Sequence, residues 1–574
     1  MPEAKLHVAE NAGRKNEEIR NIIMLVFKIA GLIISSVLLW SSFPPCAQSD
    51  SAWLALVPLL LIIRNCSPKE AFRWGFLAGL GFWVFTLSWF PAIIKNGGPW
   101  YLVILGQLAL AAVCALYMGL FACASASLWK TAGSGSSLKR VGMICLADPL
   151  LWVGTEYMRA SLFSGFAWNF LGVSQVDNTA LIQIASVVGV YGVSAVLVMV
   201  NGGIASIVER AAFPVVTKAL RRETVTYRNS LAARFLRSCE SFVPILFALL
   251  CWSWGMNRIK QWQSVERYQP ALRIALVQPN TPCRFVFNDE TMRRQLKELI
   301  EQTRFAAAAE PHLVVWPETS LLGSVPDETG TMNFARRGAE IAGNALLAGT
   351  LETRRVEKSA AAPDCMMYYN AAWMFAADGS VLGSYRKQHL VPFGEYIPLD
   401  KFFPVLQKLA PTGVSCSAGD GPSLMNLPCG ENLSVKVGAL ICFEDTVPGL
   451  SRLSVRAGAD LLALMTNDAW FNGSVEPVQH LNQSVFRAVE CAVPLVRSAN
   501  SGVSCVVDAV GRVRELTSQG RNTDFSGFLV APVHLSSGTE ISAPYVTFGD
   551  WILAVPAALL VVFVVMRLFF RRKK

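Results

Sequence analysis

Long apolar runs constrain the fold of this 574-residue chain more than any other feature of its sequence. A helix needs about 20 apolar residues to cross a hydrocarbon core about 30 Å thick. Seven such runs precede residue 258 and one lies near the end of the chain. We therefore predict about eight transmembrane helices, at Asn21–Trp40, Ala52–Ile63, Phe72–Phe90, Tyr101–Trp129, Val141–Phe163, Leu181–Val208, Phe242–Met256 and Ile552–Phe570. The sequence does not fix the ends of the second and the fifth.

The composition agrees with a polytopic membrane protein. Hydrophobic residues make up 53% of the chain and charged residues 16%, whereas about a quarter of the residues of a soluble domain are charged. The first 20 residues are polar, and no signal-peptide cleavage site follows the first apolar run. We therefore expect that run to be retained as an anchor.

Basic residues are concentrated in every second segment between the runs. Lys and Arg resist translocation, so cytoplasmic loops contain an excess of them. Few or none occur in segments 41–51, 91–100 and 164–180, whereas many occur in 1–20, 64–73, 130–140 and 210–237. We therefore expect both termini in the cytoplasm. This topology accounts for the net charge of +10, so we expect no nucleic-acid partner.

The chain divides into three predicted regions. Residues 1–257 form a membrane domain with seven transmembrane helices, residues 258–545 form an extracytoplasmic domain, and residues 546–574 form the final helix and a basic cytoplasmic tail. In the middle region, short apolar runs such as Val435–Ile441 alternate with helical patterns such as Glu476–Cys491. This alternation predicts an α/β sandwich.

Cys442 is the best candidate for a nucleophile. It follows the predicted strand Val435–Ile441 and precedes a helix that Pro448 can begin. A strand-to-helix turn exposes a side chain and directs backbone N–H groups toward a developing oxyanion. Considered alone, Cys442 also fits a buried structural cysteine, since free cysteines are commonly buried.

Two charged residues lie where they can assist such a thiol. Glu318 follows Pro317, which ends a strand because proline lacks an N–H and restricts the residue before it. Lys387 lies in Tyr385–Pro398, a segment dense in ionisable and aromatic side chains, after a hairpin predicted at Asp378-Gly379. Considered alone, each also fits a solvated surface charge.

The 14 cysteines include no CxxC pair and no cluster with histidine. We therefore expect no structural zinc site. Cys416 and Cys429 face an oxidising compartment in the predicted topology, and a disulfide between them is one option that spacing alone does not establish. His389 and His480 lack the spacing of a Cys/His dyad, and we interpret them as neighbours of the site.

Several short motifs together resemble the nitrilase superfamily. Trp316-Pro-Glu318, Arg386-Lys387 with Phe393–Pro398, and Ile441-Cys-Phe-Glu444 match the superfamily's Glu–Lys–Cys triad in the same order. Other segments are similar to elements of one membrane branch, the apolipoprotein N-acyltransferases of bacterial envelopes: Pro149–Gly172, Leu276–Asn280, Thr466–Phe471 and Arg497–Gly502. The resemblance covers nearly the whole chain.

The resemblance implies a nitrilase-like αββα sandwich and a two-step acyl transfer at the bacterial inner membrane, with the catalytic domain in the periplasm. The thiolate of Cys442 would attack an acyl ester of a phospholipid, giving a thioester and a lysophospholipid. The α-amino group of an apolipoprotein's N-terminal S-diacylglyceryl-cysteine would then accept the acyl chain. Glu318 would be the general base and Lys387 would stabilise the oxyanions. This reaction needs no metal and no cofactor, and we expect a monomer.

Further residues are implied to support the triad or to contact substrate. Phe443 stands where the family pattern has tyrosine and Phe287 where it has tryptophan, so the detail of the substrate loops is open. Glu156 and Arg159 share a predicted helix face, where they bind a head group or pair with each other. The supporting residues are Glu395, Glu444, Phe443 and Tyr396, and the substrate-binding residues are Phe287, Asn467, Trp470, Arg159 and Glu156.

Two other functions are considered. A membrane-anchored nitrilase-type amidase or hydrolase would use the same triad, because water and an amine can resolve the same thioester. Several transmembrane helices weigh against this amidase or hydrolase, because an enzyme that needs only a membrane anchor does not need so many. A transporter with an inactive outer domain is disfavoured because few ionisable residues interrupt the runs and no pair of matching broken helices is present.

Overall fold

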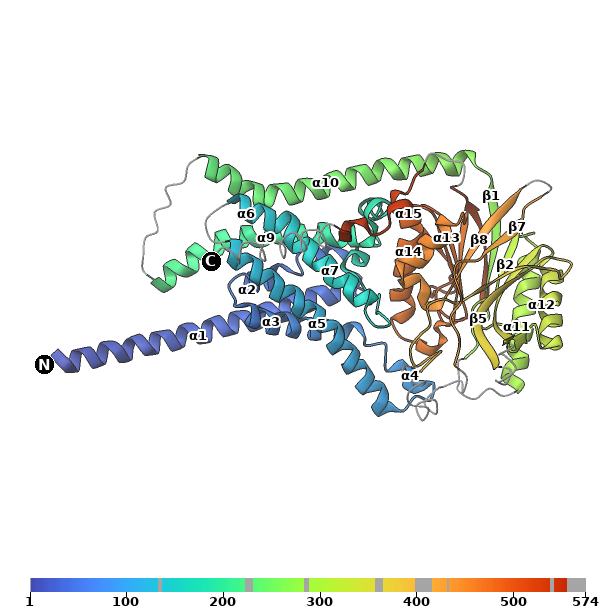
Figure 1. The fold of residues 1–574 in the computed structure, drawn as a ribbon, viewed down its shortest axis with the longest axis horizontal. Coiled ribbons are helices and arrows are strands. Elements are labelled where there is room, and N and C mark those ends of the chain that lie inside the picture. Colours follow the sequence, from blue (N-terminus) through green and yellow to red (C-terminus); the bar gives the residue numbers. More distant parts are fainter. Residues whose placement is uncertain are drawn as a thin grey trace. The chain divides into compact units, whose positions relative to one another are not determined.

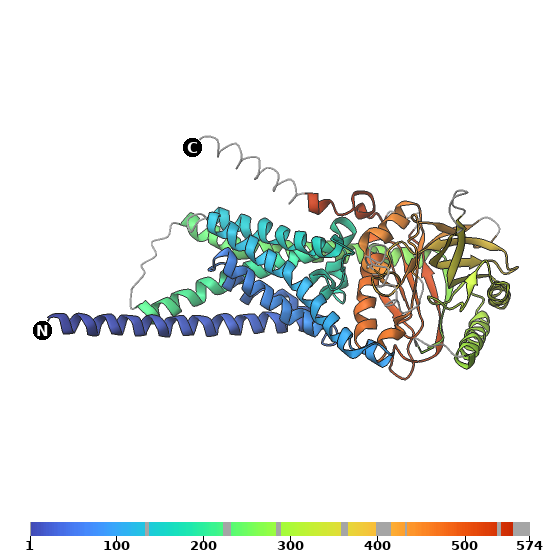
Figure 2. The same ribbon diagram turned by 60° about the horizontal axis from the view of Figure 1, so that its bottom comes forward.

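The computed structural model describes residues 2–132, 137–221, 231–282, 289–356, 365–397, 415–430, 433–536 and 541–554 (Figures 1 and 2). The chain forms two compact units. We name them the helical unit, which comprises Met1–Leu87, Gln107–Thr155 and Ala195–Ala248, and the sheet unit, which comprises Ser88–Gly106, Glu156–Ser194 and Leu249–Lys574. The predicted domain limits at 257 and 545 stay a prediction.

The helical unit consists of apolar helices. It contains α1 (Pro2–Ser41), α2 (Val57–Ile63), α3 (Pro68–Thr86), α6 (Ser137–Gly142) and most of α5 (Trp100–Ala132), α7 (Asp148–Ser161), α9 (Ala185–Arg221) and part of α10 (Leu231–Tyr268). The start of α3 is typical of these helices: Pro68 occupies the first turn, and the Ser67 side chain accepts a hydrogen bond from the Glu70 N–H.

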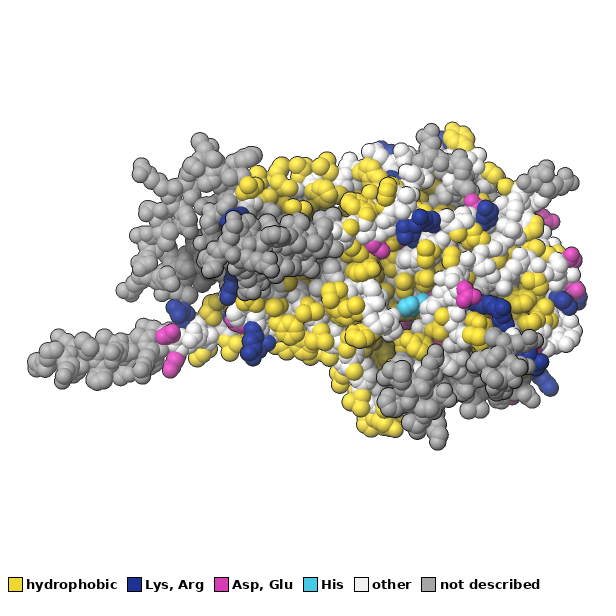
Figure 3. Space-filling model, viewed as in Figure 1, with side chains coloured by type: hydrophobic (Ala, Val, Ile, Leu, Met, Phe, Trp, Pro, Cys, Tyr) yellow, Lys and Arg dark blue, Asp and Glu magenta, His cyan; other side chains and the backbone are white. Residues whose placement is uncertain are grey.

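Within the described residues, four helical segments are long and apolar enough to cross a membrane: Glu17–Ser41, Trp100–Lys130, Ala185–Ala211 and Cys239–Tyr268. They coincide with the first, fourth, sixth and seventh predicted spans. Shorter helices, α2, α3 and α7, occupy the second, third and fifth. Most of the eighth predicted span, Ile552–Phe570, lies outside the described residues. Hydrophobic side chains cover much of the visible helical surface (Figure 3).

The sheet unit contains two mixed β-sheets. In the described residues, the first has the order β13-β1-β2-β4-β5-β6, with β3 beside β4, and the second has the order β12-β11-β10-β9-β8-β7. The strands of the first are β1 (Ala271–Gln278), β2 (Leu313–Val315), β3 (Ser324–Val325), β4 (Ala345–Val356), β5 (Cys365–Phe375), β6 (Val381–Arg386) and β13 (Gly527–His534). Those of the second are β7 (Leu424–Pro428), β8 (Ser434–Ile441), β9 (Leu461–Thr466), β10 (Leu495–Ala499), β11 (Cys505–Val507) and β12 (Val513–Glu515).

Helices cover the outer face of each sheet and an apolar core lies between the sheets. Helices α11 (Asp289–Ala307) and α12 (Thr329–Ala342) pack on the first sheet, and α13 (Pro448–Arg456) and α14 (Glu476–Cys491) pack on the second (Figures 1 and 2). The core between the sheets includes Ile274, Leu347, Val437 and Met465, all fully buried. The predicted nitrilase-like αββα sandwich is confirmed.

Parallel pairing brings several strand ends to one edge of the sandwich. Strands β1, β2 and β4 are parallel, as are β8, β9 and β10. The carboxyl ends of parallel strands meet at the same edge, which is the usual place for ligand-binding groups in α/β proteins. Glu318 follows β2, Cys442 follows β8 and Asn467 follows β9 directly.

Candidate active site

Cys442 occupies a sharp turn between β8 and a short 3₁₀ helix, Cys442–Thr446. Its φ angle is +53°, in the left-handed region that costs a non-glycine residue roughly 1–2 kcal/mol. The Ile441 N–H donates to Glu444 Oε2 at 2.8 Å and closes the turn. The strand-to-turn geometry expected for a nucleophile is therefore present.

The buried carboxylate of Glu444 connects this turn to the segment that carries Lys387. Its Oε1 accepts from the backbone N–H groups of Gln388 at 2.7 Å and His389 at 3.1 Å. The Tyr385 hydroxyl donates to the same carboxylate at 2.9 Å. Burial raises the pKa of Glu444 to about 7. Glu444 thus positions the residues on both sides of the candidate site.

Lys387 lies between two carboxylates. Its Nζ donates to Glu395 Oε1 at 2.9 Å and lies 3.7 Å from Glu318 Oε1, and its side chain is only 1% exposed. Asn370 on β5 donates from Nδ2 to Glu318 Oε1 at 2.8 Å and to Glu395 Oε1 at 2.6 Å. One cation and one amide therefore hold the two carboxylates together.

The charges of this group explain its protonation states. Burial raises the pKa of Glu318, and Lys387 opposes the effect. Burial also acts to raise the pKa of Glu395, but Lys387 and the Val391 N–H lower it below its ordinary value. Burial alone would lower the pKa of Lys387; the surrounding anions, Glu395 first, raise it overall. Lys387 therefore keeps its proton.

The Cys442 thiol rests in its neutral form. Burial and then the charge of Glu318 raise its pKa well above the ordinary value, although Lys387 acts in the opposite direction. Glu318 and the thiol affect each other's pKa, so the two groups are neighbours in the site. Because a neutral thiol is a weak nucleophile, it needs a base to remove its proton. Glu318 is in place to act as that base.

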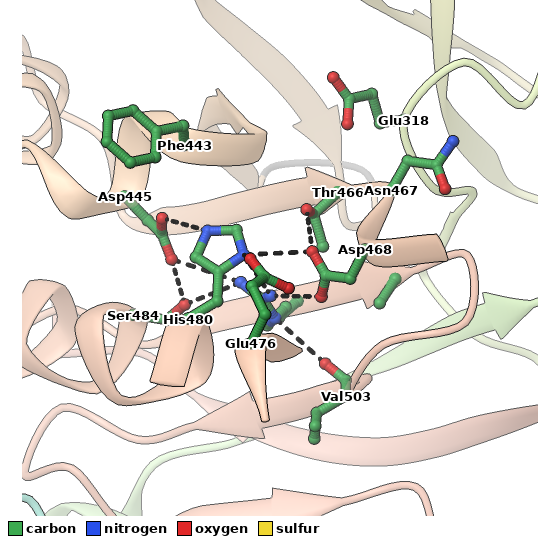
Figure 4. Close-up of polar contacts among 12 residues, drawn as sticks. Glu318, Phe443, Asp445, Thr466, Asn467, Asp468, Glu476, His480, Ser484 and Val503 are labelled. Atoms are coloured by element: carbon green, nitrogen blue, oxygen red, sulfur yellow. Dashed lines mark hydrogen bonds and ion pairs between the residues drawn. The ribbon is translucent and has the colours of Figure 1, made fainter. Parts of the chain in front are cut away.

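A second buried network lies behind the nucleophile turn (Figure 4). Arg497 on β10 donates to Asp468 Oδ2 at 2.8 Å and Asp445 Oδ2 at 3.3 Å. The His480 ring on α14 lies between the same two carboxylates, with Nε2 2.8 Å from Asp445 Oδ1 and Nδ1 3.1 Å from Asp468 Oδ1. The Ser484 hydroxyl also donates to Asp445. The network fixes the residues that follow Cys442.

Asp468, Glu476 and His480 lie close enough together to be considered as metal ligands. The guanidinium of Arg497 already supplies a cation to this cluster. Its Nη2 atom lies 3.0 Å from His480 Nδ1 and 2.8 Å from Asp468 Oδ2. Burial, with the nearby charge of Asp468, raises the pKa of Glu476 to about 8. We therefore interpret this cluster as a structural ion network.

Comparison with known proteins decides the family. Residues 35–203 match the apolipoprotein N-acyltransferase N-terminal domain, and residues 273–541 match the carbon-nitrogen hydrolase domain. The chain is 34% identical over 546 residues to the apolipoprotein N-acyltransferase of Geobacter metallireducens, covering 94% of this chain and 95% of that protein. The chain belongs to the apolipoprotein N-acyltransferase family.

Other members of the family give the same result. The chain is 30% identical over 530 residues to the apolipoprotein N-acyltransferase of Methylococcus capsulatus, covering 90% of this chain and 92% of that protein. For the protein of that name from Allorhizobium ampelinum, the identity is 29% over 518 residues, with 87% and 86% covered. An N-acyltransferase is thus confirmed over the amidase and the transporter.

In this member of the apolipoprotein N-acyltransferase family, Phe443 packs within a group of aromatic rings. It stacks on Trp168 with centroids 6.1 Å apart, on Phe166 at 6.2 Å and on His389 at 6.0 Å. The Trp168 Nε1 donates to Gln479 Oε1 at 2.9 Å. The residue after Cys442 is therefore held by ring packing, for which the hydroxyl of a tyrosine is not required.

Glu156 and Arg159 hold the segment that carries these rings. Arg159 donates to the carbonyls of Phe166 at 2.6 Å and Trp168 at 2.7 Å. Glu156 Oε1 accepts from the Leu171 N–H at 2.7 Å. Both residues are buried, and these contacts give them a positioning role. Binding of a substrate head group by either stays a prediction.

The remaining predicted residues are distributed around the strand ends. Asn467 Oδ1 accepts from Asn500 Nδ2 at 3.0 Å, and the Trp470 carbonyl accepts from Asn96 Nδ2 at 2.7 Å. The carbonyl of Tyr396 accepts from the Phe393 N–H at 2.7 Å. Phe287 lies outside the described residues. Cys416 and Cys429 are free thiols, so the disulfide considered between them is not formed.

Sequence reasoning missed Asn370 and Tyr385. Asn370 is a buried amide within the otherwise largely apolar strand β5, and this single polar position was the available signal. The buried ion network was missed because its members come from four separated elements. Only the pairing of β9 with β10 brings Arg497 near Asp468.

Proposed function

We propose that this chain transfers an acyl chain from a phospholipid to the α-amino group of an apolipoprotein's N-terminal S-diacylglyceryl-cysteine, through a thioester on Cys442. The observation that carries the proposal is the buried Glu318–Lys387–Glu395 group. Lys387 Nζ lies 3.7 Å from Glu318 Oε1, and the charge of Glu318 raises the pKa of the neighbouring Cys442 thiol. The group provides a base and a fixed cation beside a neutral nucleophile.

In the first step, Glu318 removes the thiol proton while sulfur attacks the carbonyl carbon of the phospholipid ester. A tetrahedral oxyanion forms and then collapses, breaking the bond to the glycerol oxygen. The proton on Glu318 passes to that oxygen, and a lysophospholipid leaves. The raised pKa of Glu318 suits this role, because the carboxylate is a stronger base than an exposed glutamate and its acid form returns the proton.

In the second step, the free α-amine of the apolipoprotein attacks the thioester. Glu318 accepts a proton from the nitrogen, an amide bond forms and the carbon–sulfur bond breaks. The departing sulfur takes the proton from Glu318, which restores the neutral thiol. Lys387 stabilises the oxyanion of both tetrahedral intermediates, and a backbone N–H after Cys442 adds a second donor.

Glu395 and Asn370 act on the triad rather than on the substrate. Glu395 neutralises part of the Lys387 charge and fixes its ammonium group at 2.9 Å. Asn370 fixes Glu318 by a hydrogen bond that favours the ionised carboxylate. Glu444, Phe443 and Tyr396 support the loops, and Asn467, Trp470 and Phe287 are proposed substrate contacts.

The proposed setting is the bacterial inner membrane. Four described apolar segments and the distribution of Lys and Arg support about eight spans with both termini in the cytoplasm. Residues 258–545 then lie in the periplasm. Acylated substrates remain in the bilayer because each buried methylene contributes about 0.8 kcal/mol, so a membrane-attached site meets both of them. We propose a monomer that needs no cofactor.

Intact-mass measurement after exposure to phospholipid tests the proposal. We expect the parent protein to gain one acyl mass that hydroxylamine removes, and Cys442→Ala to gain none. Addition of a diacylglyceryl-cysteine peptide should discharge the acyl group to the peptide amine. Release of free fatty acid at the same rate with and without peptide would instead identify a hydrolase.

A further inference from the structure

Arg258 on α10 is a buried arginine without a counter-ion. Arg258 is 6% exposed. Its Nε and Nη2 atoms have no hydrogen-bond partner among the described residues. The nearest group recorded for it is the Trp254 ring, whose centroid lies 5.7 Å from the guanidinium carbon. By contrast, buried Arg64 of the helical unit lies 3.6 Å from Glu209 and donates to the Gly202 carbonyl.

The packing of α10 holds Arg258 in this position. Gly255, Arg258, Trp262 and Val265 form a buried stripe at helical spacing. A Cβ atom at Gly255 would lie 1.8 Å from the Ala180 carbonyl oxygen, so the helix backbone is in direct contact with that residue. Trp262 Nε1 donates to Asp508 Oδ2 at 3.2 Å. The guanidinium lies on the same face, between these two contacts.

Two carboxylates in this part of the sheet unit, Asp508 and Glu266, already pair with another arginine. Arg512 binds Asp508 Oδ2 at 2.6 Å and Glu266 Oε1 at 2.5 Å. Neither carboxylate forms an ion pair with Arg258 in the described residues. A buried charge without a partner is costly, and the cost falls when an anion binds it. Because the described residues supply no such anion, a ligand that carries a phosphate can supply it.

The surface of α10 changes character beside Arg258. Before it, most exposed side chains of the described part of α10 are apolar, Ser253 and Asn257 being polar exceptions, and Trp252 and Trp254 are 46% and 41% exposed. After it, the exposed residues are polar and include Lys260, Gln261 and Gln263. Tryptophans gather at the boundary between hydrocarbon and water. This change places Arg258 at the depth of phospholipid head groups if α10 spans the membrane.

We propose that Arg258 binds the phosphate of an anionic membrane phospholipid. Phosphate oxygens accept charge-assisted hydrogen bonds from a guanidinium, and a head group with net negative charge supplies the counter-ion that Arg258 lacks among the described residues. Inorganic phosphate offers the same chemistry, but the adjacent exposed tryptophans favour a ligand held in the bilayer. The inference rests on the proposed transmembrane course of α10 and not on the chemistry of Cys442.

Native mass spectrometry of the full chain in detergent tests the site, with added phosphatidylglycerol, phosphatidylcholine or inorganic phosphate. All proteins carry Cys442→Ala, so lipid binding is measured independently of acyl transfer. We expect phosphatidylglycerol to bind preferentially, and Arg258→Gln to weaken its binding about tenfold. Lys260→Gln removes an exposed charge two residues away on the same helix and should bind like the parent.

Three results would overturn the proposal: equal binding of the two lipids by the parent, unchanged phosphatidylglycerol binding by Arg258→Gln, or displacement of the lipid by millimolar inorganic phosphate. The last would identify a soluble-anion site. If Arg258→Gln does not fold, the unmodified protein still decides, because phosphatidylglycerol should raise its thermal midpoint more than phosphatidylcholine does. If the parent chain with Cys442 intact is not acylated by phospholipid while the Cys442→Ala protein keeps its preference for phosphatidylglycerol, only the proposed reaction is refuted.

Discussion

The Asn370 side chain joins Glu318 and Glu395, since its single Nδ2 lies 2.8 Å from one carboxylate and 2.6 Å from the other. Two carboxylates that flank one lysine repel each other, and the amide gives both a shared donor. The arrangement couples the candidate base to the residue that fixes the ammonium group of Lys387. Changes at Asn370 should therefore alter both the rate and its pH dependence.

Asn370→Ala should slow acylation of Cys442 about tenfold to a hundredfold, because removing a buried hydrogen-bond partner costs about 1–3 kcal/mol. The pH midpoint of the rate should also rise, since the lost donor favoured the ionised form of Glu318. Single-turnover intact-mass measurements across pH provide both values. A lower rate with an unmoved midpoint would indicate a purely structural role.

Lys387→Met should reduce acylation by about 10²–10³-fold, as expected for loss of an oxyanion-stabilising group. It should also lower the free energy of unfolding by about 3–5 kcal/mol, because two buried carboxylates lose their shared cation. Lys436→Met, which changes an exposed lysine on β8, is the matched control for stability and rate. Equal effects of the two substitutions would remove Lys387 from the mechanism.

The rate of Cys442 acylation should rise with pH through the pKa of Glu318. The ionised carboxylate is the base, and burial moves its pKa above the ordinary value, so the increase should occur at higher pH than for an exposed glutamate. Glu318→Gln should abolish the increase along with the activity. Ordinary glutamate and cysteine side chains titrate near pH ~4 and pH ~8. An acylation rate that stays constant between these two pH values would contradict the role of Glu318 as the base.

Arg497→Met should destabilise the sheet unit by about 3–5 kcal/mol, because it leaves Asp445 and Asp468 buried without their main cation. Thermal unfolding measures the effect. Arg514→Met, on the exposed strand β12, removes an equal charge and should change the midpoint little. A similar midpoint for both variants would contradict the role given to the ion network.

Phe443→Tyr should keep near-normal transfer, because stacking on Trp168 and His389 depends on the ring and not on a hydroxyl. Phe443→Ala removes these ring contacts, each worth about 0.5–1.5 kcal/mol, and should lower both stability and transfer. The comparison of initial rates with a peptide acceptor separates the two variants. A strong gain in Phe443→Tyr would show that the phenol hydroxyl matters after all.

Local sequence patterns were sufficient for much of the sandwich. The predicted helix Glu476–Cys491 coincides with α14, and the predicted strand Val435–Ile441 lies within β8, because both have a strong apolar period and a clear boundary. Strands β7, β10 and β13 were not predicted. Strand β13 pairs with β1, which lies far away in the chain. Strand β10 is buried throughout, so it lacks the alternation that marks a half-exposed strand.

The candidate triad was predictable because each member lies in a short motif at a strand end. Asn370 was not, since this asparagine gains its role only when β5 pairs with β4 and β6 and so comes near Glu318, which follows β2, and Lys387, which follows β6. The same reason applies to Arg497 and His480. Distant ion pairs leave no local period in a sequence, and the burial that sets their pKa values arises only after both sheets have packed.

Residues 88–106 and 156–194 belong to the sheet unit. A truncation that removes them therefore removes part of that unit. Trp168, which follows the predicted fifth span, stacks on Phe443 and donates to Gln479. A fragment that starts at residue 258 would lack this cover and would present uncovered apolar and polar groups to water. The nitrilase-like region is therefore not a detachable module, and soluble truncations would be poor substitutes for the intact chain in screening or crystallisation.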